Sequence, residues 1–165
     1  MDDFHVDMSG RIYENKTIGI AVVGTSSKKH HGCAIKGNLI KLVKNRLFKK
    51  NIFEDSAKLY SICIYLLIRD IKKEISTLII CNDEDFNRVK RYLGILLQGI
   101  SFEIINITEF RKRLGRNIGS LADNFAKIYK KRALKPYKWK DGKNLNVISI
   151  TYNNINENWE KLSQI

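Results

Sequence analysis

The sequence has 165 residues, enough for one domain with a single hydrophobic core. It is 44% hydrophobic and 28% charged, as in ordinary globular domains, and no apolar run approaches the ~18 residues needed to cross a bilayer. Thirty Lys and Arg against 17 Asp and Glu give a formal net charge of +13. This charge favours a polyanionic partner, nucleic acid before an anionic membrane surface, with a solvated basic surface as the alternative.

The cysteines indicate a reducing compartment. Cys33, Cys63 and Cys81 are odd in number and widely spaced, without a Cys-x-x-Cys pair, so we expect neither a disulfide framework nor a zinc site. The first residues are acidic and polar, which is not typical of a signal peptide. We therefore predict a cytoplasmic protein without a membrane partner.

The first third of the chain predicts three strands and two helices. Alternating or β-branched runs at 4–10, 17–24 and 31–36, with short connections, indicate an antiparallel meander. Residues 38–49 have the pattern of an amphipathic helix with a basic face. Residues 54–73 carry the broadest apolar stripe, which predicts a helix packed on the sheet.

The remaining sequence predicts strands alternating with helices. Strands are expected at 76–81 and 102–107, and helices at 83–97, 108–114 and 120–133, the last ended by Pro136. A basic linker at 135–143 with Trp139, a late strand at 147–151 and a helix at 154–162 complete the chain. The predicted fold is α/β: an antiparallel three-strand meander followed by parallel β-α-β units, flanked by helices.

Four acids stand at the ends of predicted elements: Asp7, Glu54, Asp83 and Asp123. Each has a local explanation, as an Asx-turn at Asp7, a capping pair of Asn51 with Glu54, a helix cap at Asp83, and a Ser120-x-x-Asp123 helix start. Taken together, they would gather at one edge of the sheet, where like charges repel unless a cation binds them. His5 shares the face of Asp7, where it would either support the site or be a satisfied core histidine, and we favour the core histidine.

This order of acids resembles the ribonuclease H superfamily. The matching segments are Val6–Gly10, two further strands, the helix opening at Glu54, Leu78–Asp83 and Leu121–Ala126, so the resemblance covers about residues 3–133. It implies a ribonuclease H-like domain at 1–133, with 134–165 as a basic extension that packs on or near it. The segment 38–50 resembles an insertion, and 107–122 lacks the histidine that such enzymes commonly carry before the last acid.

The resemblance implies a metal-dependent endonuclease that cleaves the RNA strand of RNA–DNA hybrids by a two-metal-ion mechanism. Asp7, Glu54, Asp83 and Asp123 would then hold two Mg²⁺ or Mn²⁺ ions, which prefer oxygen ligands. Candidate nucleic-acid contacts are basic: Lys28, Lys29, His30, Arg113 and Arg116. The alternatives are a junction resolvase or exonuclease of the same superfamily, a non-catalytic nucleic-acid-binding protein on this fold, and an acid-lined domain that binds a small molecule or protein.

Overall fold

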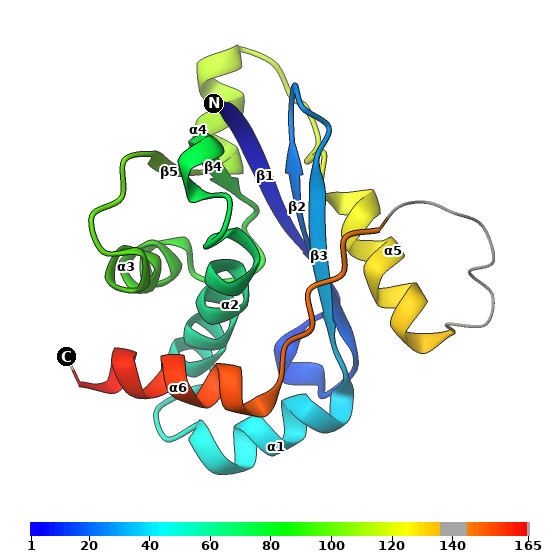
Figure 1. The fold of residues 1–165 in the computed structure, drawn as a ribbon, viewed down its shortest axis with the longest axis vertical. Helices are drawn as coiled ribbons and strands as arrows, with labels where there is room; N and C mark the ends of the chain where they lie inside the picture. Colours follow the sequence, from blue (N-terminus) through cyan, green and yellow to red (C-terminus); the bar gives the residue numbers. More distant parts are fainter. Residues whose placement is uncertain (136–144, 165) are drawn as a thin grey trace.

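The computed structural model describes residues 1–135 and 145–164 (Figure 1). Within these residues, five strands form one mixed sheet in the order β3-β2-β1-β4-β5. The strands are β1 (Asp2–Ser9), β2 (Ile18–Gly24), β3 (His30–Ile35), β4 (Ile75–Ile80) and β5 (Glu103–Asn106). The predicted α/β fold, a mixed sheet flanked by helices, is confirmed.

The central strand β1 joins the antiparallel and parallel halves of the sheet. It pairs antiparallel with β2, which pairs antiparallel with β3, and it pairs parallel with β4, which pairs parallel with β5. Because side chains alternate along a strand, Phe4, Val6 and Met8 enter the main hydrophobic core, while His5 and Asp7 lie on the other face. An acidic side chain therefore lies on the middle strand of the sheet.

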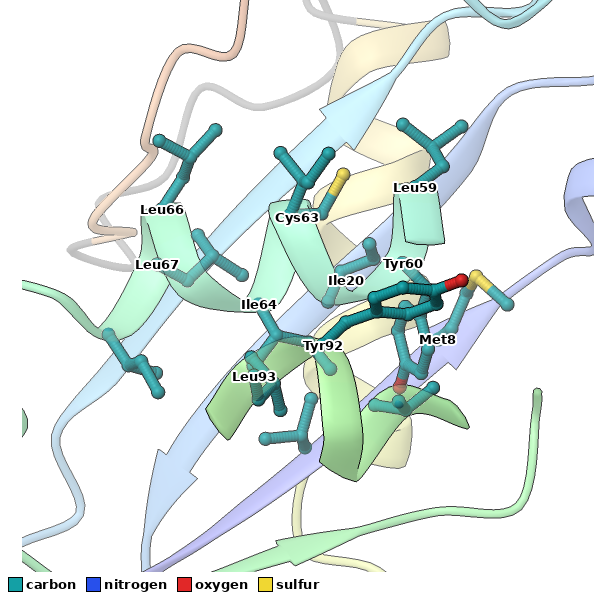
Figure 2. Packing of buried hydrophobic residues seen from close by; sticks show 14 of the residues in the cluster. Met8, Ile20, Leu59, Tyr60, Cys63, Ile64, Leu66, Leu67, Tyr92 and Leu93 are labelled. Atoms are coloured by element: carbon teal, nitrogen blue, oxygen red, sulfur yellow. The ribbon is translucent and has the colours of Figure 1, made fainter. Parts of the chain in front are cut away.

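Helices cover both faces of this sheet (Figure 1). The chain forms α1 (Gly37–Leu47), α2 (Ile52–Ile68), α3 (Phe86–Leu97), α4 (Ile107–Leu114), α5 (Asp123–Leu134) and α6 (Tyr152–Ser163), with short 3-10 turns η1 (Ile12–Glu14) and η2 (Lys72–Glu74). Helix α2 packs against β1, β2 and α3 in the main core, where Tyr60 lies near Met8 and Cys63 near Ile20 (Figure 2). On the other face, α5 packs on β2 through alanines, and α4 packs on β4 and β5.

The C-terminal segment belongs to the same core. Residues Ile155, Trp159 and Leu162 of α6 are buried with the sheet and with α2. The ring of Trp159 stacks on Phe48 at a centroid distance of 5.5 Å, so the two segments outside the resemblance pack on each other. The hydrophobic core therefore does not stop at residue 133.

The region between α5 and α6 differs from the prediction. Instead of a late strand at 147–151, a single parallel bridge joins Val147 to Gly32 of β3. Most of the predicted linker, including Pro136 and Trp139, lies outside the described residues.

Two helices begin three residues later than their sequences suggest. Helix α3 starts at Phe86 because the Asp85 side chain accepts a hydrogen bond from the Arg88 amide at 3.0 Å and so caps the helix. Helix α5 starts at Asp123 because the Ser120 hydroxyl accepts from the Ala122 amide at 3.1 Å, which forms a turn before the helix. The predicted caps at Asp83 and Ser120 are therefore wrong.

Candidate functional site

Two of the four predicted acids meet where β1 and β4 end. Asp7 lies near the end of β1, and Asp83 follows β4 by three residues. Both carboxylates accept a hydrogen bond from the same donor, the Met8 amide, at 2.8 Å for Asp7 Oδ1 and 3.3 Å for Asp83 Oδ2. Since β1 and β4 are parallel neighbours, the sheet itself brings these two side chains together.

Both side chains of the acid pair are at least partly buried. Asp7 is 8% exposed, and Asp83 is partly buried. Burial raises the pKa of Asp83 well above its usual range, and the charge of Asp7 together with a hydrogen bond to it raises the pKa further. A bound cation would relieve the same repulsion.

Neither acid of the pair is needed to cap a helix. Asp85 caps α3, which leaves the Asp83 carboxylate free of that role. Asp7 Oδ1 accepts from the next amide, Met8, and not from Ser9 as an Asx-turn would require. The local explanations predicted for these two acids therefore do not account for them.

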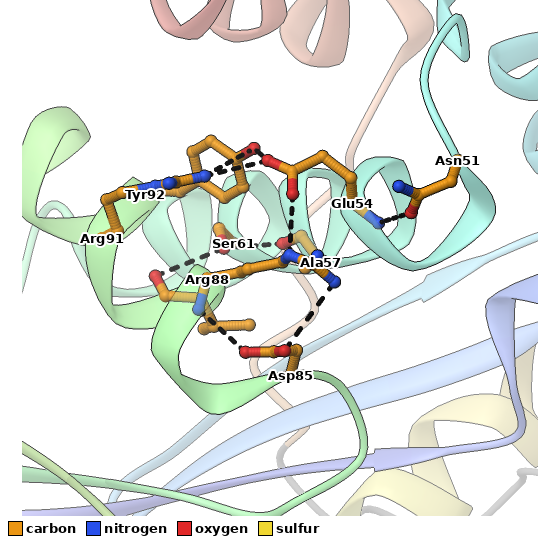
Figure 3. Close-up of polar contacts among 9 residues, drawn as sticks. Asn51, Glu54, Ala57, Ser61, Asp85, Arg88, Arg91 and Tyr92 are labelled. Carbon is orange, nitrogen blue, oxygen red and sulfur yellow. Dashed lines mark hydrogen bonds and ion pairs between the residues drawn. The ribbon is translucent and has the colours of Figure 1, made fainter.

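Glu54 does not join the pair, and its predicted convergence is wrong. Its carboxylate forms ion pairs with Arg88 at 2.7 Å and Arg91 at 2.9 Å, and it accepts a hydrogen bond from the Tyr92 hydroxyl (Figure 3). That hydrogen bond and the two arginines keep the pKa of Glu54 below its ordinary value. The reason is helical geometry: position 54 faces α3, whereas Ser56, two residues on, faces the acids.

Asp123 begins α5 and binds a lysine. Its carboxylate accepts from Lys127 Nζ at 2.8 Å, one helical turn later, and about half of the side chain is exposed. The hydrogen bond to Asp123 raises the pKa of Lys127, and the charge of Asp7 contributes in the same direction. Helix α5 packs on Ala21 and Val23 of β2, which lie opposite Asp7 and His5 in the sheet, so Asp123 begins its helix on the side of β1 that carries Asp7.

A pocket of about 530 Å³ opens beside Asp83. Its rim carries two strongly exposed aromatic side chains, Tyr13 at 55% and Phe53 at 68%. The pocket is lined by Arg11, Tyr13, Ile52, Phe53, Ser56, Asp83, Glu84 and Asp85. Exposed rings next to buried carboxylates suit a ligand that has both flat faces and charge.

The sequence analysis missed several polar groups of this site. Burial raises the pKa of Glu84 to about 7, and Arg11 opposes this shift only in part. The hydroxyls of Ser56 and Tyr60 are buried and have no hydrogen-bond partner among the described residues. The run Asp83-Glu84-Asp85 directly after a buried strand was the available signal, since three successive acids cannot all be explained by one helix cap.

The predicted contacts Lys28 and Lys29 do not border the acid pair. The turn before Lys28 and Lys29 is held to the start of β1, where the Asp2 carboxylate accepts from the Ser27 amide at 2.9 Å. From Asp2 to Asp7 an extended strand runs about 16 Å. Lys29 also pairs with Glu74 at 2.7 Å. That these lysines bind nucleic acid stays a prediction, at a place remote from the acids.

Two of the other three predicted contacts are engaged with other side chains, and the third is exposed. His30 Nδ1 forms a hydrogen bond of 2.9 Å with the Tyr129 hydroxyl, and the imidazole ring stacks on Phe125. The ring of His30 is therefore packed against α5. Arg113 binds both carboxylate oxygens of Glu103, at the start of β5, while Arg116 is exposed beyond α4. Arg11 lines the pocket beside Asp83, and Lys127 pairs with Asp123.

His5 is a core histidine, as predicted, but it is not fully satisfied. It is 1% exposed and lies edge-on to Phe110, and burial lowers its pKa, so the ring is neutral. Its Nδ1 has no hydrogen-bond partner among the described residues.

With this geometry in place, the chain was compared with known proteins. No family model and no curated protein matches it. Among the described residues, no helix has the length and apolar character that a bilayer crossing requires. Within the same ranges, no group of three or more His, Cys, Asp or Glu is placed to hold a metal ion.

Proposed function

We propose that this protein is a metal-dependent nuclease whose centre is the pair Asp7 and Asp83, with the RNA strand of RNA–DNA hybrids as the favoured substrate. The observation that carries the proposal is the shared Met8 amide, which holds two mutually repelling, buried carboxylates at the ends of parallel strands. The antiparallel meander joined to parallel strands supports it, because the ribonuclease H resemblance implies such a sheet.

The donor set fits one hydrated divalent cation. Mg²⁺ is usually held by one or two carboxylates and keeps several waters, and Asp7 with Asp83 supply two carboxylates. The unpartnered hydroxyls of Ser56 and Tyr60 would accept hydrogen bonds from such waters. The second ion of a two-metal mechanism would draw on Glu84 or on Asp123, since Glu54 is bound to α3.

The protein groups around the pair suit a nucleic-acid strand. When bound, the cation supplies an activated water and neutralises charge on the scissile phosphate. Arg11 and Lys127 carry positive charge next to the acids and would contact phosphate oxygens. The exposed rings of Tyr13 and Phe53 offer surfaces on which bases stack.

The test is cleavage of labelled hybrid, duplex and junction substrates in Mg²⁺ and in Mn²⁺. Asp7→Asn keeps the shape of the side chain but removes a metal ligand, so we expect a loss of roughly 100-fold or more in cleavage rate. Asp70→Asn, at an exposed position after α2, removes the same charge elsewhere and should leave the rate unchanged. Melting temperature controls for folding. An Asp7→Asn variant that folds and cleaves at the wild-type rate would refute the proposal.

One observation favours a second candidate, a non-catalytic nucleic-acid-binding protein on the same fold. Glu54 is held by two arginines and a tyrosine, which removes one of the four acids that the resemblance implies. This candidate predicts that the wild type binds hybrid tightly but never cleaves it in either metal. The same assay, read for binding as well as cleavage, separates the two candidates.

A further inference from the structure

A second polar pocket lies on the opposite side of α2 from the acid pair. It has a volume of about 290 Å³ and is bounded by α2, α3 and the end of α6. Three cationic side chains and two hydroxyl-bearing ones line it together with two aliphatic residues: Lys50, Lys58, Arg91, Tyr92, Ile95, Leu162 and Ser163. Nothing in the proposed nuclease site uses these residues.

Lys58 is the unusual residue of this pocket. Its side chain is 4% exposed, although lysines are almost never buried unless paired. Its ammonium lies 4.7 Å from the ring centroid of Trp159 and 5.7 Å from that of Tyr92, so aromatic faces support it in part. Within the described ranges, Lys58 has no ion pair, and burial lowers its pKa.

The carboxylates nearest to Lys58 in the sequence, Glu54 and Asp55, bind other groups. Glu54 is held by Arg88, Arg91 and Tyr92, as Figure 3 shows. Asp55, which is 2% exposed, accepts from the backbone amides of Lys49 and Lys50 at 3.0 and 2.8 Å and so closes the turn before α2. Arg91 is therefore paired with Glu54, whereas Lys58 has no ion pair among the described residues, and a buried, unpaired charge is costly.

We propose that this pocket binds a phosphate group, with Lys58 as its central cation and Lys50 and Arg91 at its mouth. An anion at this place would compensate the buried ammonium. The Tyr92 and Ser163 hydroxyls already donate to Glu54 and to the Trp159 carbonyl, so the charge of the lysines would carry the binding. The volume is at the lower end of ligand pockets, about 300 Å³, which suits a phosphate with little attached inside. The inference does not rest on the nuclease proposal.

The first experiment measures inorganic phosphate binding to the intact chain. Melting temperature is followed against phosphate concentration at constant ionic strength, with chloride as the replaced anion. A specific site raises the melting temperature progressively with phosphate. In Lys58→Met, which fills the same space without charge, we expect this rise to disappear, whereas Lys41→Met on the exposed face of α1 should keep it.

A second variant tests the proposal independently, in case Lys58→Met does not fold. Lys50 is exposed, so Lys50→Gln should fold normally and weaken phosphate binding by about tenfold, as expected for loss of one charged contact. If both variants respond to phosphate as the wild type does, or if chloride has the same effect at equal ionic strength, the proposal is wrong.

Two sources supply the same chemistry, a free phosphate compound or the backbone of a nucleic acid. Binding of a 5′-phosphorylated mononucleotide and of a short single-stranded oligonucleotide is measured for the wild type and Lys50→Gln. A weaker oligonucleotide complex in the variant, together with competition by phosphate, assigns the pocket to the backbone. A weaker mononucleotide complex alone assigns it to a small ligand. No change in either complex would overturn the proposal.

Discussion

Burial of Glu84 makes its titration a probe of the acidic site. Its pKa in the folded chain is raised to about 7, and the pKa of Asp83 is raised as well. Between about pH 4.5 and 7 the folded chain therefore binds more protons than the unfolded chain, so the free energy of unfolding falls as pH rises. In a chelator, we expect the melting temperature to decrease across this range. Glu84→Gln should flatten the decrease, and Glu160→Gln, at an exposed position of α6, should not.

A divalent cation bound at the acid pair would stabilise the fold in a pH-dependent way. The pKa of Asp83 is raised, so protons would compete with the metal for this ligand, and the increase in melting temperature caused by millimolar Mg²⁺ should be larger at about pH 8 than at about pH 5. Asp83→Asn should abolish the difference, because it removes a ligand and a titrating group together. Equal stabilisation by Mg²⁺ at both pH values would argue against metal binding at the pair.

At the scale of elements, the placement of α5 depends on a glycine in β2. A Cβ atom at Gly19 would lie 2.2 Å from the carbonyl oxygen of Ala126, which belongs to the helix backbone and cannot move alone. We expect Gly19→Ala to destabilise the fold by about 1–3 kcal/mol and to displace Asp123 with its helix. Gly94→Ala, on the open side of α3, meets nothing within 4 Å and should stabilise by about 0.5–1 kcal/mol. Chemical denaturation of both variants tests this.

Most helices and strands were predictable because their apolar patterns are regular. The directions of single side chains and the first residues of helices were not. The alternation in β1 and the stripe of α2 fix which faces are buried. The helix starts were misplaced because Asp83 and Asp85 are equally good caps by composition, and only the structure shows which side chain reaches an amide. The prediction for Glu54 failed for a tertiary reason. The direction of the Glu54 side chain depends on where α3 places Arg88 and Arg91, and a single sequence does not show this.

For the whole molecule, the net charge of +13 predicts salt-sensitive binding to nucleic acid. Each phosphate contact releases counterions, so the logarithm of the binding constant should fall linearly with the logarithm of salt concentration, by about 0.9 per contact on duplex DNA. Lys28 and Lys29 lie in the turn between β2 and β3. Replacing both by glutamine should reduce that slope if this turn contributes phosphate contacts. Affinity that is insensitive to salt would show that the basic surface has no polyanionic partner.

The position of α6 in the core has a consequence for synthesis of the chain. Trp159 and Leu162 complete a core whose other members begin at Phe4, so the apolar faces of α1, α2 and α3 remain partly uncovered until α6 has emerged from the ribosome. A nascent chain released at residue 133 would expose those faces and the ring of Phe48. The helical layer is therefore expected to close only once α6 is available, with the meander formed earlier.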